Sequence, residues 1–180
     1  ALLGGFAFLE PNATLIVSGE TKIHKNKALD KGGAIYAAAN SRVVLTGGFD
    51  GKVWKTVDIE YNEASEGGGI YLEGNAVLQH RGLIIQNNKA FTGAGIFAND
   101  AKILGVPDLS KQYYGKIDSV VQFNEAVESS ENFMYDNSKI VVSVDQKGVG
   151  GGIYVGGTGG SSAIDNLNFT FNKGRLGGGM

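Results

Sequence analysis

A short motif recurs five times along this chain, and such internal repetition constrains the fold more than any other sequence feature. In each copy an apolar residue precedes an asparagine by three positions, and small residues follow the asparagine by two and by six positions. The chain is therefore assembled from similar structural units. The five copies are Ile23–Asn26, Ile59–Asn62, Ile85–Asn88, Val121–Asn124 and Phe169–Asn172.

Each glycine-containing segment leads into a β-prone pair such as Ile35-Tyr36 or Ile70-Tyr71, which is typical of a strand entered through a tight corner. The unit thus reads as strand, Asn corner, Gly corner and strand. A further corner is indicated by Asn12, Asn40 and Asn75, each seven residues after a glycine. The predicted repeat corners are Asn26, Asn62, Asn88, Asn124, Asn172, Gly32, Gly68, Gly151 and Gly178.

The last two asparagines of the repeat, Asn124 and Asn172, are 48 residues apart, which is the longest interval in the series. Asp145 lies between them, with Val142 three residues before it and Gly151 six residues after it. We therefore interpret Asp145 as a diverged corner that marks an additional rung.

Short strands cannot bury an apolar face alone, but successive rungs that stack align equivalent residues into a shared interior. The column Ile23, Ile59, Ile85, Val121 and Phe169 is the expected interior, and alternation places Leu167, Phe169 and Phe171 on one face. No segment has the apolar spacing of a helix. The sequence predicts an all-β, right-handed parallel β-helix of the pectin-lyase-like solenoid type, with about six rungs.

Asparagine suits corners because it tolerates left-handed backbone angles, and stacked asparagines can hydrogen-bond from rung to rung. Glycine at the other corner allows positive φ and close approach of neighbouring rungs.

We expect one repeat domain over residues 1–180, a fragment of a longer chain that is open at both ends. The two 36-residue intervals contain loop-like sequence near 46–55 and 105–116, and we expect inserted loops there.

The composition excludes several classes of function. A net charge of −2 without a basic stripe makes nucleic acid an unfavourable partner. The absence of cysteine excludes thiol catalysis and zinc–thiolate sites. The apolar opening over residues 1–8 is too short to cross a membrane and lacks the basic start of a signal peptide. We expect no cofactor, no metal and no membrane-spanning segment.

The motifs resemble the repeats of the chlamydial polymorphic outer membrane proteins, which pair FxxN with GGA(I/L/V). Gly32-Gly33-Ala34-Ile35 matches the second motif and Phe169-Thr170-Phe171-Asn172 matches the first, with near-matches elsewhere along most of the chain. The resemblance implies a surface-exposed β-helical passenger, exported by an autotransporter route with a separate C-terminal outer-membrane barrel, that takes part in host-cell adhesion.

The main alternative is a polysaccharide-binding or polysaccharide-cleaving β-helix of the pectate-lyase type, because fold alone does not determine function. Glycoside hydrolysis needs two carboxylates about 5 to 10 Å apart. The nearest candidates are Asp58 with Glu60 and Glu63 with Glu66, which we expect to be solvated. We also expect both histidines, His24 and His80, at the surface.

The hypothesis that we favour is a non-catalytic, extracellular or cell-surface module that binds a host or neighbouring-cell protein or glycan through its inserted loops. Trp54, Tyr113 and Tyr114 lie in those loops, where exposed aromatic residues often contact partners and can equally pack as a lid over the core.

Overall fold

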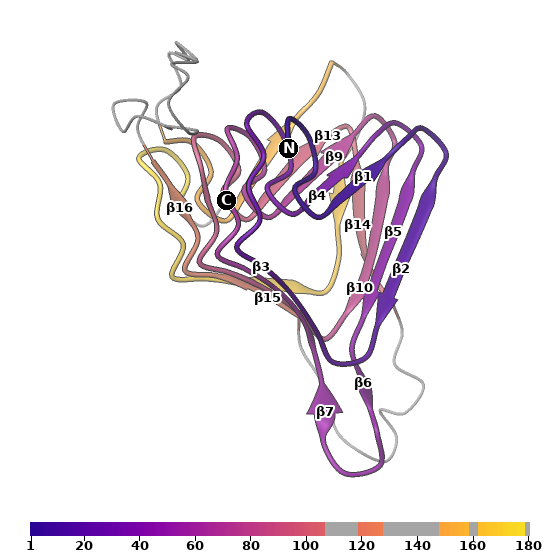
Figure 1. Cartoon of the computed structure of the whole chain (residues 1–180). Helices are drawn as coiled ribbons and strands as arrows, with labels where there is room; N and C mark the ends of the chain where they lie inside the picture. Colours follow the sequence, from indigo (N-terminus) through magenta and orange to yellow (C-terminus); the bar gives the residue numbers. More distant parts are fainter. Residues whose placement is uncertain (107–118, 128–147, 159–161, 179–180) are drawn as a thin grey trace.

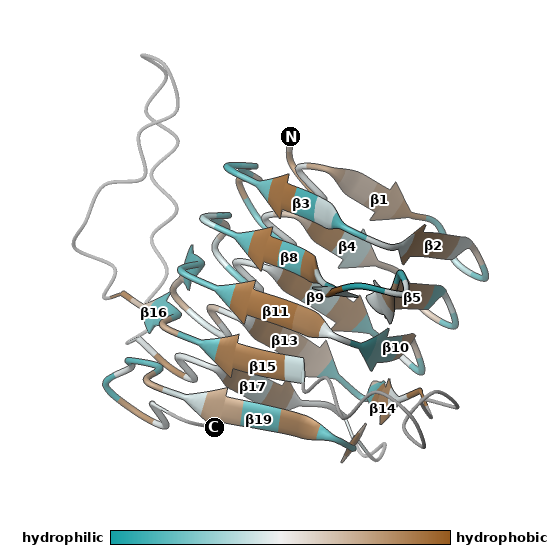
Figure 2. Ribbon diagram, turned by 90° about the horizontal axis from the view of Figure 1, so that it is seen from below, coloured by the Kyte–Doolittle hydropathy of each residue, from teal (hydrophilic) through white to brown (hydrophobic). Residues whose placement is uncertain are grey.

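The chain is all-β and winds repeatedly through three parallel sheets. The computed structural model describes residues 1–106, 119–127, 148–158 and 162–178, and these form strands, turns and loops without a helix. None of these residues therefore provides a helix long and apolar enough to cross a membrane. Figure 1 looks along the stack, and Figure 2 shows the strands of successive circuits lying side by side.

Each sheet contains five strands, one from each circuit of the chain, which we call a rung. The β1 sheet contains β1 (Ala7–Leu9), β4 (Ile35–Ala37), β9 (Ile70–Glu73), β13 (Ile96–Asn99) and β17 (Ile153–Gly156). The β2 sheet contains β2 (Thr14–Ser18), β5 (Arg42–Thr46), β10 (Val77–Arg81), β14 (Lys102–Gly105) and β18 (Ala163–Ile164). The β3 sheet contains β3 (Thr21–His24), β8 (Val57–Glu60), β11 (Leu83–Gln86), β15 (Ser119–Gln122) and β19 (Leu167–Thr170).

Every pairing within these three sheets is parallel and joins equivalent positions of adjacent rungs. A shorter sheet continues the stack past the Asn corner, where β12 (Lys89–Ala90) pairs with β16 (Glu125–Ala126). Consecutive parallel strands of one sheet are thus separated by a full circuit, an arrangement consistent with a β-helix.

The interior is the predicted apolar column together with its counterparts from the other two sheets. Ile23, Ile59, Ile85, Val121 and Phe169 are matched residue to residue in the β3 sheet, so the predicted register is confirmed. All but Phe169 are buried, and Phe169 packs against the same core. Phe171 is an exception to the predicted alternation. It leaves the strand at a positive φ of 53° and is 77% exposed.

The outer face of the β1 sheet carries a second apolar layer. Phe8, Tyr36, Tyr71, Phe97 and Tyr154 stack from rung to rung, with ring centroids 4.6 to 5.5 Å apart. Such contacts add to the stabilisation from burial alone. The second residue of each β-prone pair therefore contributes to packing outside the central core.

Lys31 lies over this aromatic layer, with its Nζ 4.7 Å from the Tyr71 ring centroid, a cation–π geometry. The Tyr36 hydroxyl donates a hydrogen bond to the Glu73 carboxylate. Burial, the hydrogen bond to Glu73 and the Glu73 charge raise the pKa of Tyr36 above its ordinary value.

A substitution in the central column tests this register. Ile85→Asp places an unpaired charge among fully buried side chains, and we expect a loss of at least about 4 kcal/mol of stability. The melting temperature, measured by circular dichroism, should fall by more than about 10 °C. Val120→Asp on the outer face of β15 is the matched control and should shift it by much less. Equal shifts for the two variants would contradict the register.

Candidate functional site

The asparagines of the repeat form a continuous hydrogen-bonded ladder along the edge of the β3 sheet. Each side-chain Nδ2 donates to the Oδ1 of the next asparagine at 2.9 to 3.0 Å, and each backbone N–H donates to the same Oδ1 at 2.9 to 3.1 Å. This confirms the prediction that stacked asparagines bond to one another. The members are Asn26, Asn62, Asn88, Asn124 and Asn172.

The second N–H of the asparagine side-chain amides also donates a hydrogen bond. Asn62, Asn88, Asn124 and Asn172 donate from Nδ2 to a backbone carbonyl of the preceding rung at 2.9 to 3.0 Å. Asn62, Asn88 and Asn124 are at most 1% exposed, so these bonds satisfy amides that water cannot reach.

The left-handed backbone angle predicted for these asparagines lies one residue earlier. Positive φ occurs at Lys25, Tyr61, Asn87, Phe123 and Phe171, each directly before a ladder asparagine. That residue reverses the backbone so that the following asparagine points into the stack, and its own side chain points outward. The prediction holds for the other corner, where Asn12, Asn40 and Asn75 have φ values of 59° to 65°.

The predicted Gly corners serve two purposes. Gly32 has a φ of 65°, but in later rungs the positive φ falls one residue before the predicted glycine, at Gly67, Gly150 and Gly177. Gly68 and Gly151 are needed for close approach instead. A Cβ on Gly68 would lie 2.3 Å from the Lys89 carbonyl oxygen, and one on Gly151 would lie 2.2 Å from that of Lys173. At Gly178 the nearest atom to such a Cβ would be 3.1 Å away.

The interpretation of Asp145 as an additional rung is wrong. Asp145 itself lies outside the described residues, but Asn124 donates directly to Asn172 and β15 pairs directly with β19. No rung can therefore separate the two asparagines. The additional length lies between Asn124 and the Gly150 corner, in the same circuit, because β17 pairs directly with β13 of the preceding rung.

A column of alternating charge runs beside the ladder, and sequence reasoning missed it. The residue after each ladder asparagine is in turn Lys27, Glu63, Lys89, Glu125 and Lys173, and these stack in parallel register. The Nζ–Oε distance is 2.6 Å for both Lys27–Glu63 and Lys173–Glu125. Each exposed ion pair contributes little stability. If a rung paired with the next rung but one, however, two residues of like charge would meet in this column. Comparison of the residues that directly follow the repeat asparagines would have revealed the column from the sequence.

The predicted loop near 46–55 is an antiparallel hairpin that projects from the stack (Figure 1). Strand β6 (Gly48–Phe49) pairs with β7 (Trp54–Lys55), which places Phe49 opposite Trp54. The centroids of these two rings are 5.3 Å apart, and both residues are partly buried. Trp54 therefore packs against Phe49 within the hairpin.

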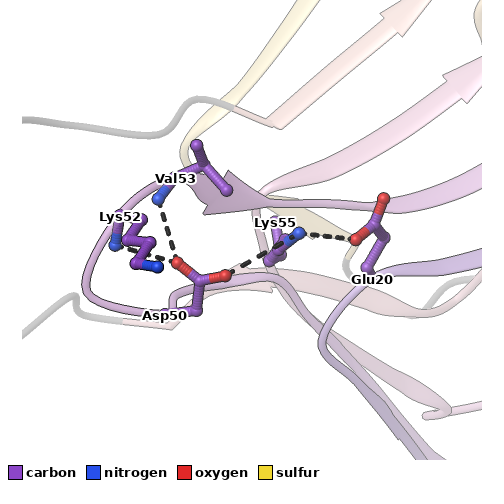
Figure 3. Close-up of polar contacts among 5 residues, drawn as sticks. All are labelled: Glu20, Asp50, Lys52, Val53 and Lys55. Atoms are coloured by element: carbon purple, nitrogen blue, oxygen red, sulfur yellow. Dashed lines mark hydrogen bonds and ion pairs between the residues drawn. The ribbon is translucent and has the colours of Figure 1, made fainter.

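Polar contacts hold the tip and the base of the hairpin (Figure 3). The Asp50 carboxylate accepts hydrogen bonds from the backbone N–H groups of Lys52 and Val53, both at 2.9 Å, and these bonds lower the pKa of Asp50. Lys55 Nζ lies 2.6 Å from Glu20 Oε2 and 3.7 Å from Asp50 Oδ2. The hydrogen bond to Glu20 raises the pKa of Lys55.

The base of the hairpin is also fixed to the next rung. Arg81 donates from Nε and Nη2 to the Gly47 carbonyl oxygen at 3.1 and 3.0 Å. The Gly47 backbone N–H in turn donates to the Arg81 carbonyl at 2.7 Å. The hairpin therefore leaves the stack from a defined position. Of the second predicted loop, near 105–116, only Gly105 and Val106 are described, so Tyr113 and Tyr114 lie outside the described residues.

The acidic pair Asp58 and Glu60 faces outward on β8 but is more covered than we expected. Glu60 exposes 13% of its side chain, lies 3.6 Å from Lys22 Nζ and accepts a hydrogen bond from Gln86. Asp58 Oδ1 is buried and has no hydrogen-bond partner among the described residues. Because these acids are two residues apart on one face of a strand, their α-carbons are about 7 Å apart. In the other pair, Glu63 is bound to Lys27.

Of the two histidines, His24 is exposed as predicted and His80 is not. His80 is 1% exposed and hydrogen-bonded through both ring nitrogens. In the described part of the chain, His, Asp and Glu side chains form no group of three that could hold a metal ion.

The fold and the ladder define an all-β repeat protein in which every rung reproduces one corner motif. The family model of the Chlamydia polymorphic membrane protein repeat matches residues 20–38. These residues include β3, the Asn26 corner, the Gly32 corner and β4. The chain thus carries a repeat of this family. Comparisons with curated proteins and with solved structures gave no match.

The ladder can be tested at its centre. Asn88→Ala removes two donors and one acceptor from buried groups of three neighbouring rungs. We expect a loss of about 3 kcal/mol or more in urea unfolding followed by fluorescence. Asn87→Gly, which keeps the positive φ on the outward-facing neighbour, should cost less than about 1 kcal/mol. If both variants unfold at the wild-type midpoint, the ladder does not stabilise the stack.

Proposed function

We propose that this chain is a right-handed parallel β-helix that serves as a non-catalytic, surface-exposed scaffold. In this proposal it presents its inserted loops to a protein or glycan on a host or neighbouring cell. The handedness is supported by the path of the chain in Figure 1, where β1, β2 and β3 follow one another clockwise from the near, N-terminal end of the stack. The hairpin leaves the stack between the β2 and β3 sheets, and the second predicted loop lies in the sequence between β14 of the β2 sheet and β15 of the β3 sheet.

The observation that carries the functional proposal is the anchored hairpin. A stack held by fully satisfied ladder amides is rigid, and the hairpin extends from it on a base fixed by Arg81 and Glu20. The hydrogen bonds that hold Asp50 and the Phe49–Trp54 contact fix the hairpin itself. Binding through such a preordered element avoids much of the entropy that a flexible loop would lose. The matched repeat agrees with a surface-exposed, autotransporter-type protein, for which the corresponding location is the bacterial cell surface.

Removing the hairpin tests this proposal. Deletion of residues 48–55 removes a segment outside the core, so the shortened chain should retain its cooperative melting. Binding of labelled protein to cultured host cells should fall by about tenfold or more, as for other anchor elements at interfaces.

Ile16→Ser is the control for this experiment, because Ile16 is 68% exposed on the outer face of β2 and lies outside the hairpin. This variant should bind like the wild type. A deletion variant that folds and binds with unchanged affinity would contradict a role of the hairpin in adhesion.

A second candidate is cleavage or binding of a polysaccharide, which the outward-facing pair Asp58 and Glu60 favours. An α-carbon separation of about 7 Å is compatible with the carboxylate separations that glycoside hydrolases use. Against it, the contacts of Glu60 with Lys22 and Gln86 leave it poorly placed to transfer a proton.

Incubation with pectin-like and other long polysaccharides separates the two candidates. We expect no release of reducing or unsaturated sugars by the wild-type protein. Release that is lost in both Asp58→Asn and Glu60→Gln would overturn the non-catalytic proposal and identify these acids as catalytic.

A further inference from the structure

His80 occupies an unusual place for a titratable side chain. It lies on β10 with its imidazole turned into the interior of the stack, where it is 1% exposed. The residue paired with it in the preceding rung is Leu45, and the one in the following rung is Gly105. Because Gly105 has no side chain, the imidazole can extend along the stack toward later rungs.

The imidazole contacts two later rungs. Its Nδ1 is 2.9 Å from Ser119 Oγ at the start of β15, in the fourth rung. Its Nε2 is 2.9 Å from the backbone carbonyl oxygen of Asp165, which lies between β18 and β19 in the fifth rung. One side chain of the third rung thus joins three consecutive rungs.

These partners determine which nitrogen carries the proton. A carbonyl oxygen only accepts hydrogen bonds, so Nε2 must donate to Asp165. In the neutral ring Nδ1 then accepts from the Ser119 hydroxyl, whose oxygen accepts in turn from the Leu83 backbone N–H at 3.1 Å. Every buried polar atom of this set has a partner when the imidazole is neutral.

The contacts gather at the fourth-rung corner between β14 and β15. In the third rung Gly82 alone connects β10 to β11. In the fourth rung β14 ends at Gly105 and β15 begins at Ser119. The imidazole connects that corner to its neighbours, and Val106 N–H donates to the His80 backbone carbonyl at 2.8 Å.

We propose that His80 is a pH-sensitive latch at this corner: the neutral imidazole holds the third, fourth and fifth rungs together, and its protonation releases them. A protonated ring carries a hydrogen on Nδ1, which faces the hydrogen of the Ser119 hydroxyl. That hydroxyl must turn away, and a positive charge remains in an apolar interior.

The surrounding charges do not offset this cost. Burial lowers the pKa of His80 below its ordinary value, opposed by the hydrogen bond to the Asp165 carbonyl and the Asp165 charge. On the adjoining strands, Arg42 and Lys102 are exposed on the outer face, and Arg81 donates to Gly47. Because the folded-state pKa is the lower one, the contribution of His80 to stability is complete above the unfolded pKa of about 6.5 and is lost as the pH falls below it.

The test compares melting temperatures at pH 7.5 and pH 5.0 for the wild type and two variants. His80→Gln retains a donor for the Asp165 carbonyl and an acceptor for Ser119 but cannot titrate. The melting temperature of the wild type should fall between pH 7.5 and pH 5.0, a change that we call the acid shift. In His80→Gln the acid shift should be smaller by the contribution of His80, about 3 °C for each unit by which the pKa is lowered. His24→Gln, at an exposed position, should keep the full acid shift of the wild type. An acid shift in His80→Gln equal to that of the wild type would overturn the proposal.

A second measurement uses only the wild-type protein and does not depend on how the variants fold. Titration of the imidazole carbon-bound protons by NMR should give His80 a pKa below the ordinary histidine value of about 6.5. Amide exchange at Leu83 and Ser119 should accelerate by tenfold or more between pH 7.5 and pH 5.0, after correction for the intrinsic rates, while exchange at Ile59 should change less. A pKa for His80 at or above about 6.5, or equal changes at all three amides, would overturn the latch.

Discussion

The buried amide ladder is the interaction on which the stacking of this chain depends. An asparagine side chain in the interior is costly unless all of its donors and acceptors are satisfied, and here they are satisfied by the rungs on either side. That condition holds only when neighbouring rungs stack with the asparagines in line. The ladder thus converts a general tendency of parallel strands to pair into one definite register.

The other columns of the stack follow from that register. Once the asparagines align, the apolar residues three positions earlier meet in the interior and the charged residues one position later alternate in sign. The aromatic layer on the β1 sheet aligns in the same way at the other side of the rung. None of these columns needs a strong pairwise interaction, because each is repeated in every rung and all specify the same alignment.

The sequence predicts this repeated part of the structure well, since residues at equal offsets from Asn26 and Asn62 occupy matching positions in the stack. The prediction fails where the environment of a residue depends on local backbone geometry or on another rung. The outward turn of Phe171 follows from a backbone reversal that spacing does not reveal, and His80 is interior because Gly105 in the next rung leaves room for it. Asp145 was misplaced for a related reason: an interval of 48 residues gives the amount of inserted chain but not the corner at which it leaves.

The inserted segments are the parts of the chain that the repeat does not constrain, and this bears on where function can reside. A substitution at Asn88 or Gly68 disturbs the neighbouring rungs, so the corners have little freedom to adapt to a partner. The hairpin at residues 48–55 contacts the stack mainly through its base, at Gly47 and Lys55, so its tip can vary without cost to the register. On the role inferred for His80, the fourth rung is in addition joined to its neighbours by a titratable side chain. The hairpin, which is free to acquire a binding role, and the acid-sensitive contacts of His80 therefore belong to different rungs.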